Sequence, residues 1–185
     1  QENIKHCFEI LPKEITMALI KASVEKNYVH IFLYRERVIS RMLSVEYARR
    51  TGIWGWKLAK LKKPTSDTFD IPLNVTKMVN VEAKIIHMFN YIWNLCKISS
   101  AIQPIAISYE DIYEADAQKT LSRIRQVFER VGLRPDNEKC IEIVNELRAR
   151  GDQNTRHLYD QFKGIEHLKE MVDTLPPYLF QSGYS

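Results

Sequence analysis

IFLYRERVISRMLSVEYARRTGIWGW, residues 31–56, is the stretch that decides the fold of this chain. Its first residues complete a continuous apolar run over 28–34 that is rich in β-branched and aromatic side chains. Such a run predicts a strand covered on both faces, as in a parallel sheet. The run stops at Arg35, and a helix is predicted from about residue 36 to a natural stop at Gly52. The apolar stripe of that helix is Val38, Ile39, Met42, Leu43 and Tyr47.

The length and composition of the chain are those of an ordinary globular protein. Its 185 residues are 45% hydrophobic and 27% charged, which suits one domain over residues 1–185 with a sizeable core. The formal net charge is +4 and the pI is near 8.9. A mildly basic chain is compatible with an anionic ligand, but this charge is too small to indicate a nucleic-acid partner.

The remaining elements complete an α/β pattern. A short strand is predicted over 3–10, and Ile15, Ala18, Leu19 and Ala22 give one apolar face to a helix from Pro12 to about Lys26. Strands that alternate with helices indicate a parallel sheet with right-handed crossovers. Three strands make a narrow sheet for this length. Further along the chain we predict an irregular excursion over 53–73, a long helix over 74–99, a strand over 104–109, a helix over 121–131, another over 135–151 and two short helices within 154–174.

Several classes of protein are excluded by the pattern of apolar and cysteine residues. No apolar run approaches the roughly 20 residues that span a bilayer, and no secretory signal opens the chain. Cys7, Cys96 and Cys140 are far apart, in apolar contexts, and no Cys/His spacing indicates a metal site. We therefore expect buried thiols in a reducing compartment, and a cytoplasmic protein without a metal.

A candidate anion site follows the apolar run. Arg35 comes directly after the predicted strand, at the sheet edge where α/β folds bind ligands. Ser44 lies about two turns into the next helix, so both side chains could reach one anion, with help from the helix N-terminus. The alternative is a solvated Arg35 and a Ser44 that bonds back to its own helix. Arg41, Arg49 and Arg50 need no special role.

The same stretch resembles the bacterial branch of the sulfotransferases that use 3′-phosphoadenosine-5′-phosphosulfate, which includes trehalose- and lipopolysaccharide-sulfating types. A second block, 105–133, is similar to their late strand, Tyr-Glu-Asp-Leu turn and helix, and a weaker match covers 152–172, where Gly164 replaces the usual Asn. Arg37 departs from the usual Asn or Asp. The matching residues are Leu33, Arg35, Ser44, Ala48, Thr51, Gly52 and Trp54 in the first block and Tyr109, Glu110 and Asp111 in the second.

The resemblance implies a fold, a cofactor and residue roles. It implies a helix-rich, three-layer P-loop-type sulfotransferase fold with a small parallel sheet. It implies that Arg35 and Ser44 bind the cofactor's 3′-phosphate, and that Tyr109, Glu110 and Asp111 form a turn that supports the site. The product would be adenosine 3′,5′-bisphosphate.

Two further parts of the family's site are a phosphosulfate-binding loop and a base. No glycine of this chain lies between an early strand and a helix with Ser or Thr beside it. Either the loop and its strand precede the residues given, or the protein no longer binds the sulfate end of the cofactor. The start at Gln1 and the narrow sheet favour the first expectation. For the base, the segment 4–12 occupies the place of a family segment, which makes His6 the first candidate and Glu9 the second, with Lys5 near the leaving phosphate. The alternative is that His6 is merely packed or exposed.

The excursion over 53–73 carries aromatic and basic residues: Trp54, Trp56, Lys57, Lys60, Lys62 and Lys63. These residues could form a lid over the acceptor. The alternative is a solvated loop with two packed tryptophans. The acceptor is expected to be a carbohydrate or other small molecule with a hydroxyl group, and the oligomeric state stays open.

Two other functions compete with sulfuryl transfer. One is a non-catalytic, sulfotransferase-like binding module, and the other is a small-molecule kinase on a P-loop scaffold, although no GxxxxGK[ST] segment is present.

Overall fold

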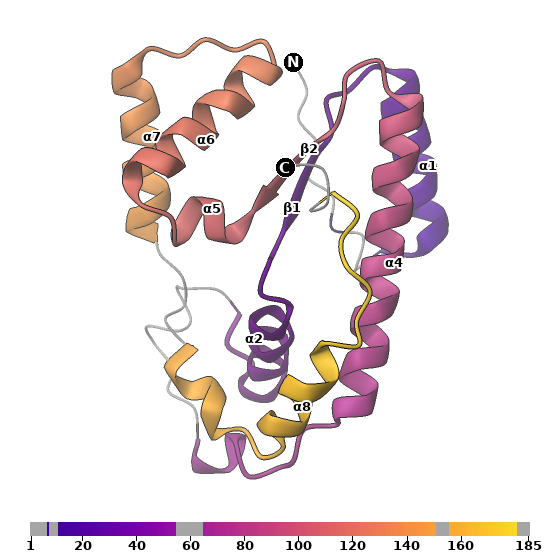
Figure 1. Ribbon diagram of the computed structural model, residues 1–185, viewed down its shortest axis with the longest axis vertical. Coiled ribbons are helices and arrows are strands. Elements are labelled where there is room, and N and C mark those ends of the chain that lie inside the picture. The colour runs from indigo at the N-terminus through magenta and orange to yellow at the C-terminus, as the bar shows by residue number, and fades with distance from the viewer. Residues whose placement is uncertain (1–6, 8–10, 55–64, 151–155, 181–185) are drawn as a thin grey trace. The chain divides into compact units, whose positions relative to one another are not determined.

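The computed structural model describes residues 7, 11–54, 65–150 and 156–180 of the chain. Within these residues, strands β1 (Ile31–Tyr34) and β2 (Ile105–Ser108) pair in a small parallel sheet, and helices make up most of the rest (Figure 1). This confirms the α/β character expected from the alternating pattern. The helices are α1 (Lys13–Glu25), α2 (Val38–Thr51), α4 (Val75–Ser99), α5 (Tyr109–Tyr113), α6 (Ala117–Arg130), α7 (Asn137–Arg150) and α8 (Ile165–Val172), with the short 3-10 helices η1 (Ser66–Thr68) and η2 (Arg156–Gln161).

Helix α2 begins and ends close to the predicted positions. Met42, Leu43 and Tyr47 of its predicted stripe are buried. Gly52 follows the helix with a φ of 66°, in the left-handed region that glycine adopts without the steric cost that a β-carbon brings. The long helix over 74–99 is confirmed as α4, and both short helices within 154–174 are present as η2 and α8. The predicted strand over 3–10 lies outside the described residues except for Cys7, which belongs to no regular element.

Two predictions about β1 are wrong. The strand is shorter than the predicted run, and it is not covered on both faces, because Ile31 is 44% exposed and Leu33 is 67% exposed. All of β2, in contrast, is buried. The apolar run predicted the presence of a strand correctly, but β-propensity does not specify which elements cover the two faces of that strand. Among the described residues, β2 is the one strand that pairs with β1.

The predicted apolar face of α1 is also wrong. Ile15 is 52% exposed, and Ala18 and Ala22 are exposed as well, whereas the buried residue of the helix is Thr16. Because α1 has apolar residues around most of its circumference, the 3.6-residue period alone does not select the buried side.

The segment Tyr109, Glu110 and Asp111 was expected to form a turn, but it forms the first part of the helix α5.

The chain divides into two compact units, and β1, β2 and α4 contribute residues to both. The first unit comprises residues 1–32, 83–106 and 176–185. Its aromatic cluster joins α4 to the C-terminal segment through edge-on and tilted ring contacts. Asn90 fixes that segment, since its Nδ2 donates to the carbonyl of Pro177 at 2.9 Å and its Oδ1 accepts from the amide of Leu179 at 2.9 Å. The cluster consists of Phe32, Phe89, Trp93, Tyr178 and Phe180.

A second polar feature of the first unit is the buried His30. Its Nε2 lies 2.8 Å from the hydroxyl of Ser23, and its Nδ1 lies 3.3 Å from the hydroxyl of Ser100. Because Ser23 donates its own proton to the carbonyl of Ile20 at 2.7 Å, it accepts from His30, which places the proton of the neutral ring on Nε2. Ser23 therefore cannot be activated by His30 as a nucleophile, and the three side chains form a structural bridge.

The cysteines match the expected buried thiols only in part. Cys96 and Cys140 are buried, and burial raises the pKa of the Cys96 thiol to about 11. Cys96 is therefore a neutral thiol at physiological pH. Cys7, however, is exposed, contrary to the expectation.

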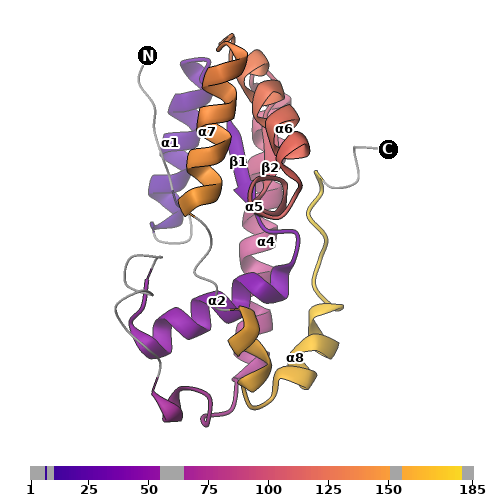
Figure 2. The same ribbon diagram turned by 90° about the vertical axis from the view of Figure 1, so that its left-hand side faces the viewer.

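The second unit, residues 33–82 and 107–175, has two apolar clusters. The larger one packs α2, the start of α4, η2 and α8 together, and Figure 2 shows α8 beside α2. The smaller one lies between α6 and α7, which also pack on α5 (Figure 1). The larger cluster consists of Met42, Leu43, Tyr47, Ile53, Leu73, Val75, Val79, Tyr159, Phe162, Ile165 and Leu168.

Candidate functional site

Two segments of the second unit meet at the carboxyl edge of the sheet. Arg35 follows the last residue of β1, as predicted, and Tyr109 follows the last residue of β2 (Figure 1). Because the strands are parallel neighbours, the residues after them lie at the same edge, where α/β folds bind ligands. The Cζ atom of Arg35 lies 4.1 Å from the centroid of the Tyr109 ring, over its face. The two segments are therefore in direct contact at this edge.

Arg35 keeps its positive charge available. Within the described part of the chain its guanidinium makes no hydrogen bond and no ion pair, and its recorded contact is the ring of Tyr109. A half-buried guanidinium in such a place has its five N–H donors free for an external acceptor. Phosphate and carboxylate groups are the acceptors that fit this planar fork best.

Arg37 differs from Arg35 in this respect. It forms ion pairs with Glu114 and with Glu110, the latter at 3.8 Å between Nε and Oε1. Its charge is therefore balanced by two carboxylates, one from Glu110 in α5 and one from Glu114 directly after α5. Of the two arginines that flank Glu36, only Arg35 is left to bind an anion among the described residues.

Glu110 also closes the turn between β1 and α2. Its Oε2 accepts a hydrogen bond from the amide of Glu36 at 3.0 Å, and its Oε1 accepts from the amide of Arg37 at 3.3 Å. Arg37, at the N-cap of α2, gives the helix no side-chain cap, unlike the Asn or Asp that the resemblance leads one to expect. The carboxylate of Glu110 thus lies at the N-terminal, positive end of the α2 dipole, where we had expected a bound anion to lie.

Ser44 lies in the second turn of α2 and is half-buried. Its hydroxyl makes no hydrogen bond to any residue that the structure describes, so it is not bonded back to its own helix. Arg35 and Ser44 make no hydrogen bond to each other, although they belong to one strand–turn–helix segment. The structure thus leaves both predicted phosphate-binding groups with unused polar atoms.

The other predicted site residues lie mostly outside the described part of the chain. This holds for both candidate bases, His6 and Glu9, and for Lys5. Of the predicted lid, only Trp54 is described, and its side chain is 59% exposed. The remaining lid residues, Trp56, Lys57, Lys60, Lys62 and Lys63, also lie outside.

The cofactor implied by the resemblance has two anionic ends, and each would need its own binding groups. Arg35 and Ser44 offer the fork and the hydroxyl that a 3′-phosphate requires. The described strand-to-helix connections are the turn at 35–37 and the direct passage from β2 into α5, and neither contains a glycine. A backbone cradle for the phosphosulfate end is therefore not among the residues that the structure describes.

Two arginines that were given no special role have structural ones. Arg41 donates to Glu82 of α4 from Nε at 2.9 Å and from its second terminal nitrogen, and Glu82 is 1% exposed. Glu82 interrupts the buried stripe of α4, and a carboxylate at a core position signals a buried partner. Arg50 donates to the carbonyls of Thr68 and Ile71 at 2.9 and 2.7 Å. It thereby ties the end of the 53–73 excursion to α2.

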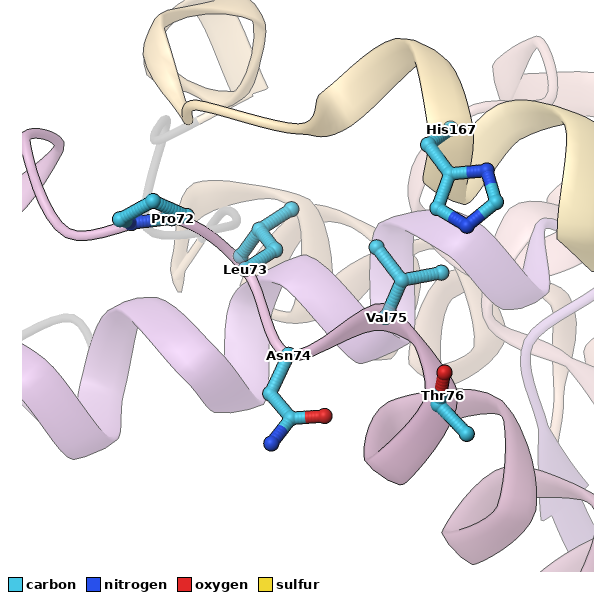
Figure 3. A pocket seen from close by; sticks show the side chains of 6 residues that line it. All are labelled: Pro72, Leu73, Asn74, Val75, Thr76 and His167. Carbon is cyan, nitrogen blue, oxygen red and sulfur yellow. The ribbon is translucent and has the colours of Figure 1, made fainter.

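A shallow hollow of about 420 Å³ lies at the start of α4, in the second unit. Figure 3 shows the His167 ring, from α8, on the same side as Val75, while the Asn74 side chain points away. The Asn74 side chain accepts from the amide of Lys77 at 3.1 Å and so caps the helix. The Nδ1 atom of His167 lies 3.5 Å from Oε2 of Glu170. Both polar side chains therefore make contacts within their own helices, and none of the residues that line the hollow belongs to the site around Arg35.

Two kinds of feature are absent from the described residues. No group of three or more His, Cys, Asp or Glu side chains there could hold a metal ion. None of the described helices combines the length and the apolar character needed to cross a membrane.

Comparison with known proteins gives no match: no protein-family model, no curated protein and no solved structure matches this chain. The resemblance to the sulfotransferases therefore rests on the quoted sequence blocks. The cofactor and the activity stay predictions, and the geometry around Arg35 is the physical basis on which a function can be proposed.

Proposed function

We propose that this chain is a sulfotransferase, or part of one, and that Arg35 and Ser44 bind the 3′-phosphate of 3′-phosphoadenosine-5′-phosphosulfate. The observation that carries the proposal is the guanidinium of Arg35 at the carboxyl end of β1, which has no ion-pair partner among the residues that the structure describes. Three glutamates lie nearby: Glu36 follows Arg35 in the sequence, while Glu110 and Glu114 form ion pairs with Arg37. A cation that stays unneutralised in such surroundings is suited to an anionic ligand.

The chemistry of the proposed reaction divides between the two ends of the cofactor. The sulfuryl group passes from the 5′-phosphosulfate to an acceptor hydroxyl, with loss of the hydroxyl proton to a base and release of adenosine 3′,5′-bisphosphate. Arg35 and Ser44 would hold the end that does not react, which orients the cofactor without entering the bond changes. His6 and Glu9 remain the proposed bases, and a carbohydrate or small-molecule hydroxyl remains the proposed acceptor.

Calorimetric titration with adenosine 3′,5′-bisphosphate tests the proposal. Loss of a charged hydrogen bond costs about 1.5–3 kcal/mol, so Arg35→Ala should weaken binding about 10- to 150-fold. Ser44→Ala removes one hydrogen bond to the same charged phosphate and should also weaken binding, toward the lower end of that range, about 10-fold. Adenosine 5′-monophosphate, which lacks the 3′-phosphate, should bind the wild-type protein and both variants alike.

Arg49→Ala is the matched control, since it removes the same charge from the exposed side of α2, where Arg49 pairs with Glu46 at 2.9 Å. Its affinity for the bisphosphate should equal that of the wild-type protein. If Arg35→Ala and Arg49→Ala bind the bisphosphate equally well, the phosphate-binding role of Arg35 is refuted.

A non-catalytic binding module is the second proposal, and a specific observation favours it. Neither described strand-to-helix connection has the glycine that a phosphosulfate cradle requires. Such a module would bind the bisphosphate, with the same loss in Arg35→Ala, yet transfer no labelled sulfuryl group to any hydroxyl in an acceptor panel. Transfer to a carbohydrate acceptor would rule this second proposal out.

A further inference from the structure

The ring of Tyr109 contacts Arg35 in a way that leaves the arginine's donors unused. The Cζ atom lies 4.1 Å from the ring centroid, well within the roughly 6 Å at which a cation is attracted to an aromatic face. This attraction acts between the positive charge and the ring and involves no hydrogen bond to an oxygen acceptor, and within the described residues the N–H donors of Arg35 make none. A carboxylate in the same place would have taken those donors, as Glu110 and Glu114 take those of Arg37.

Tyr109 is itself held in place by its neighbours in α5. Its ring lies 4.4 Å from that of Tyr113 at an interplanar angle of 30°, one helical turn further along. The helix begins with a capping box in which the amide of Asp111 donates to Ser108 Oγ at 2.9 Å and the amide of Ser108 donates to Asp111 Oδ2 at 3.2 Å. The ring therefore projects from a fixed helix start.

The next residue, Glu110, fixes the backbone on the other side of the contact. By accepting from the amides of Glu36 and Arg37, its carboxylate joins the turn that follows Arg35 to α5. Glu110 thus fixes the turn that directly follows Arg35, and Tyr109 contacts the Arg35 side chain. A flexible arginine held in this way loses less rotamer freedom when it binds a phosphate.

We infer that Tyr109 is a positioning residue, which holds the guanidinium of Arg35 through a cation–π contact and leaves its N–H donors to a phosphate group. The inference rests on the proposed function, because it takes the ligand of Arg35 to be a phosphate. It extends that function to a residue which the sequence resemblance assigned only to the support of a turn.

Titration with two nucleotides separates this role from general damage to the fold. Replacing Tyr109 by Leu removes the ring, and the contact has the strength of a half-buried cation–π pair, so binding of adenosine 3′,5′-bisphosphate should weaken about 2- to 30-fold. Binding of adenosine 5′-monophosphate should not change. Tyr109→Phe keeps the ring and should bind the bisphosphate like the wild-type protein. Tyr91→Leu, at an exposed tyrosine of α4, is the matched control and should change neither affinity.

A second measurement reads the contact without any ligand. In nuclear magnetic resonance spectra the Arg35 side-chain N–H signals should be shifted by the ring current of Tyr109 in the wild-type protein and in Tyr109→Phe. They should return to ordinary positions in Tyr109→Leu. Absence of this shift in the wild-type protein overturns the inference, whatever the titrations show.

The outcomes also separate the inference from the proposal beneath it. If the wild-type protein does not bind the bisphosphate more tightly than the monophosphate, the proposed function fails, and the inference fails with it. If the wild-type protein makes this distinction, Arg35→Ala loses it and Tyr109→Leu retains it, only the inference is overturned. Equal weakening of both nucleotides in Tyr109→Leu would show a general structural defect and would also overturn it.

Discussion

Glu82→Gln should destabilise the second unit strongly, because it leaves Arg41 beside a neutral amide in a buried place. Glu82 is 1% exposed and accepts two hydrogen bonds from the guanidinium, one of them at 2.9 Å. Removing one partner of a buried ion pair costs about 3–5 kcal/mol. Since the side chain of Arg41 is 16% exposed and water can reach part of it, we expect the lower part of that range, about 3 kcal/mol.

The size of this effect makes it easy to measure. A domain is stable by about 5–15 kcal/mol, so the variant would lose a fifth or more of the total. At about 2–4 °C per kcal/mol for a chain of this length, its melting temperature should fall by about 6–12 °C. Urea denaturation followed by far-UV circular dichroism gives the free energy, and hydrogen exchange of the α2 amides locates the loss.

Two further variants test the reasoning behind the number. Glu142→Gln makes the same substitution in the exposed pair with Lys139 and should leave stability unchanged. The double variant Arg41→Met with Glu82→Leu removes both charges and should recover most of the loss, since the penalty comes from removing one partner of a buried pair while the other stays. Equal stability of Glu82→Gln and Glu142→Gln would refute the assignment of this loss to the buried pair of Arg41 and Glu82.

Two other predictions concern stability. Burial lowers the pKa of His30 from 6.5, so the unfolded chain takes up a proton at a higher pH than the folded protein does. Stability should therefore be complete above about pH 6.5 and fall as the pH drops below it, and His30→Gln should flatten this dependence in urea denaturation between about pH 8 and pH 5. An equal slope in both proteins would contradict it. Arg50→Lys loses the fork that serves the carbonyls of Thr68 and Ile71 and should cost about 1–3 kcal/mol in thermal unfolding, while Arg49→Lys should cost nothing measurable.

Local sequence signals predicted the elements well where the signal was strong. Helix α2 was predicted from its apolar stripe and from Gly52, which ends it with a φ of 66°. The long helix α4 was predicted from an apolar period that persists over its whole length. The order of strand, Arg35 and helix could be read directly as well, because a change from a continuous apolar run to a 3.6-residue period is a property of adjacent residues.

The same signals failed where burial depends on distant residues. Leu33 lies in an apolar strand and is 67% exposed, while Thr16 lies in an apolar helix and is buried. Exposure depends on which elements pack against a residue, and a local pattern does not contain that information. The assignment of no role to Arg41 failed for the same reason, because its partner Glu82 lies far along the chain.

For the candidate site, the sequence by itself determined the residue types and their order: an arginine after a strand, a serine in the next helix and a Tyr-Glu-Asp segment after a second strand. Only the tertiary structure decided how they are used. Pairing of β1 with β2 brings Tyr109 over Arg35, and Glu110 takes the amides at the start of α2 while pairing with Arg37. The physical reason is that the neighbours in space decide whether a charge is paired. Among the described residues they pair Arg37 with two carboxylates and give Arg35 none, although the two arginines lie almost side by side in the sequence.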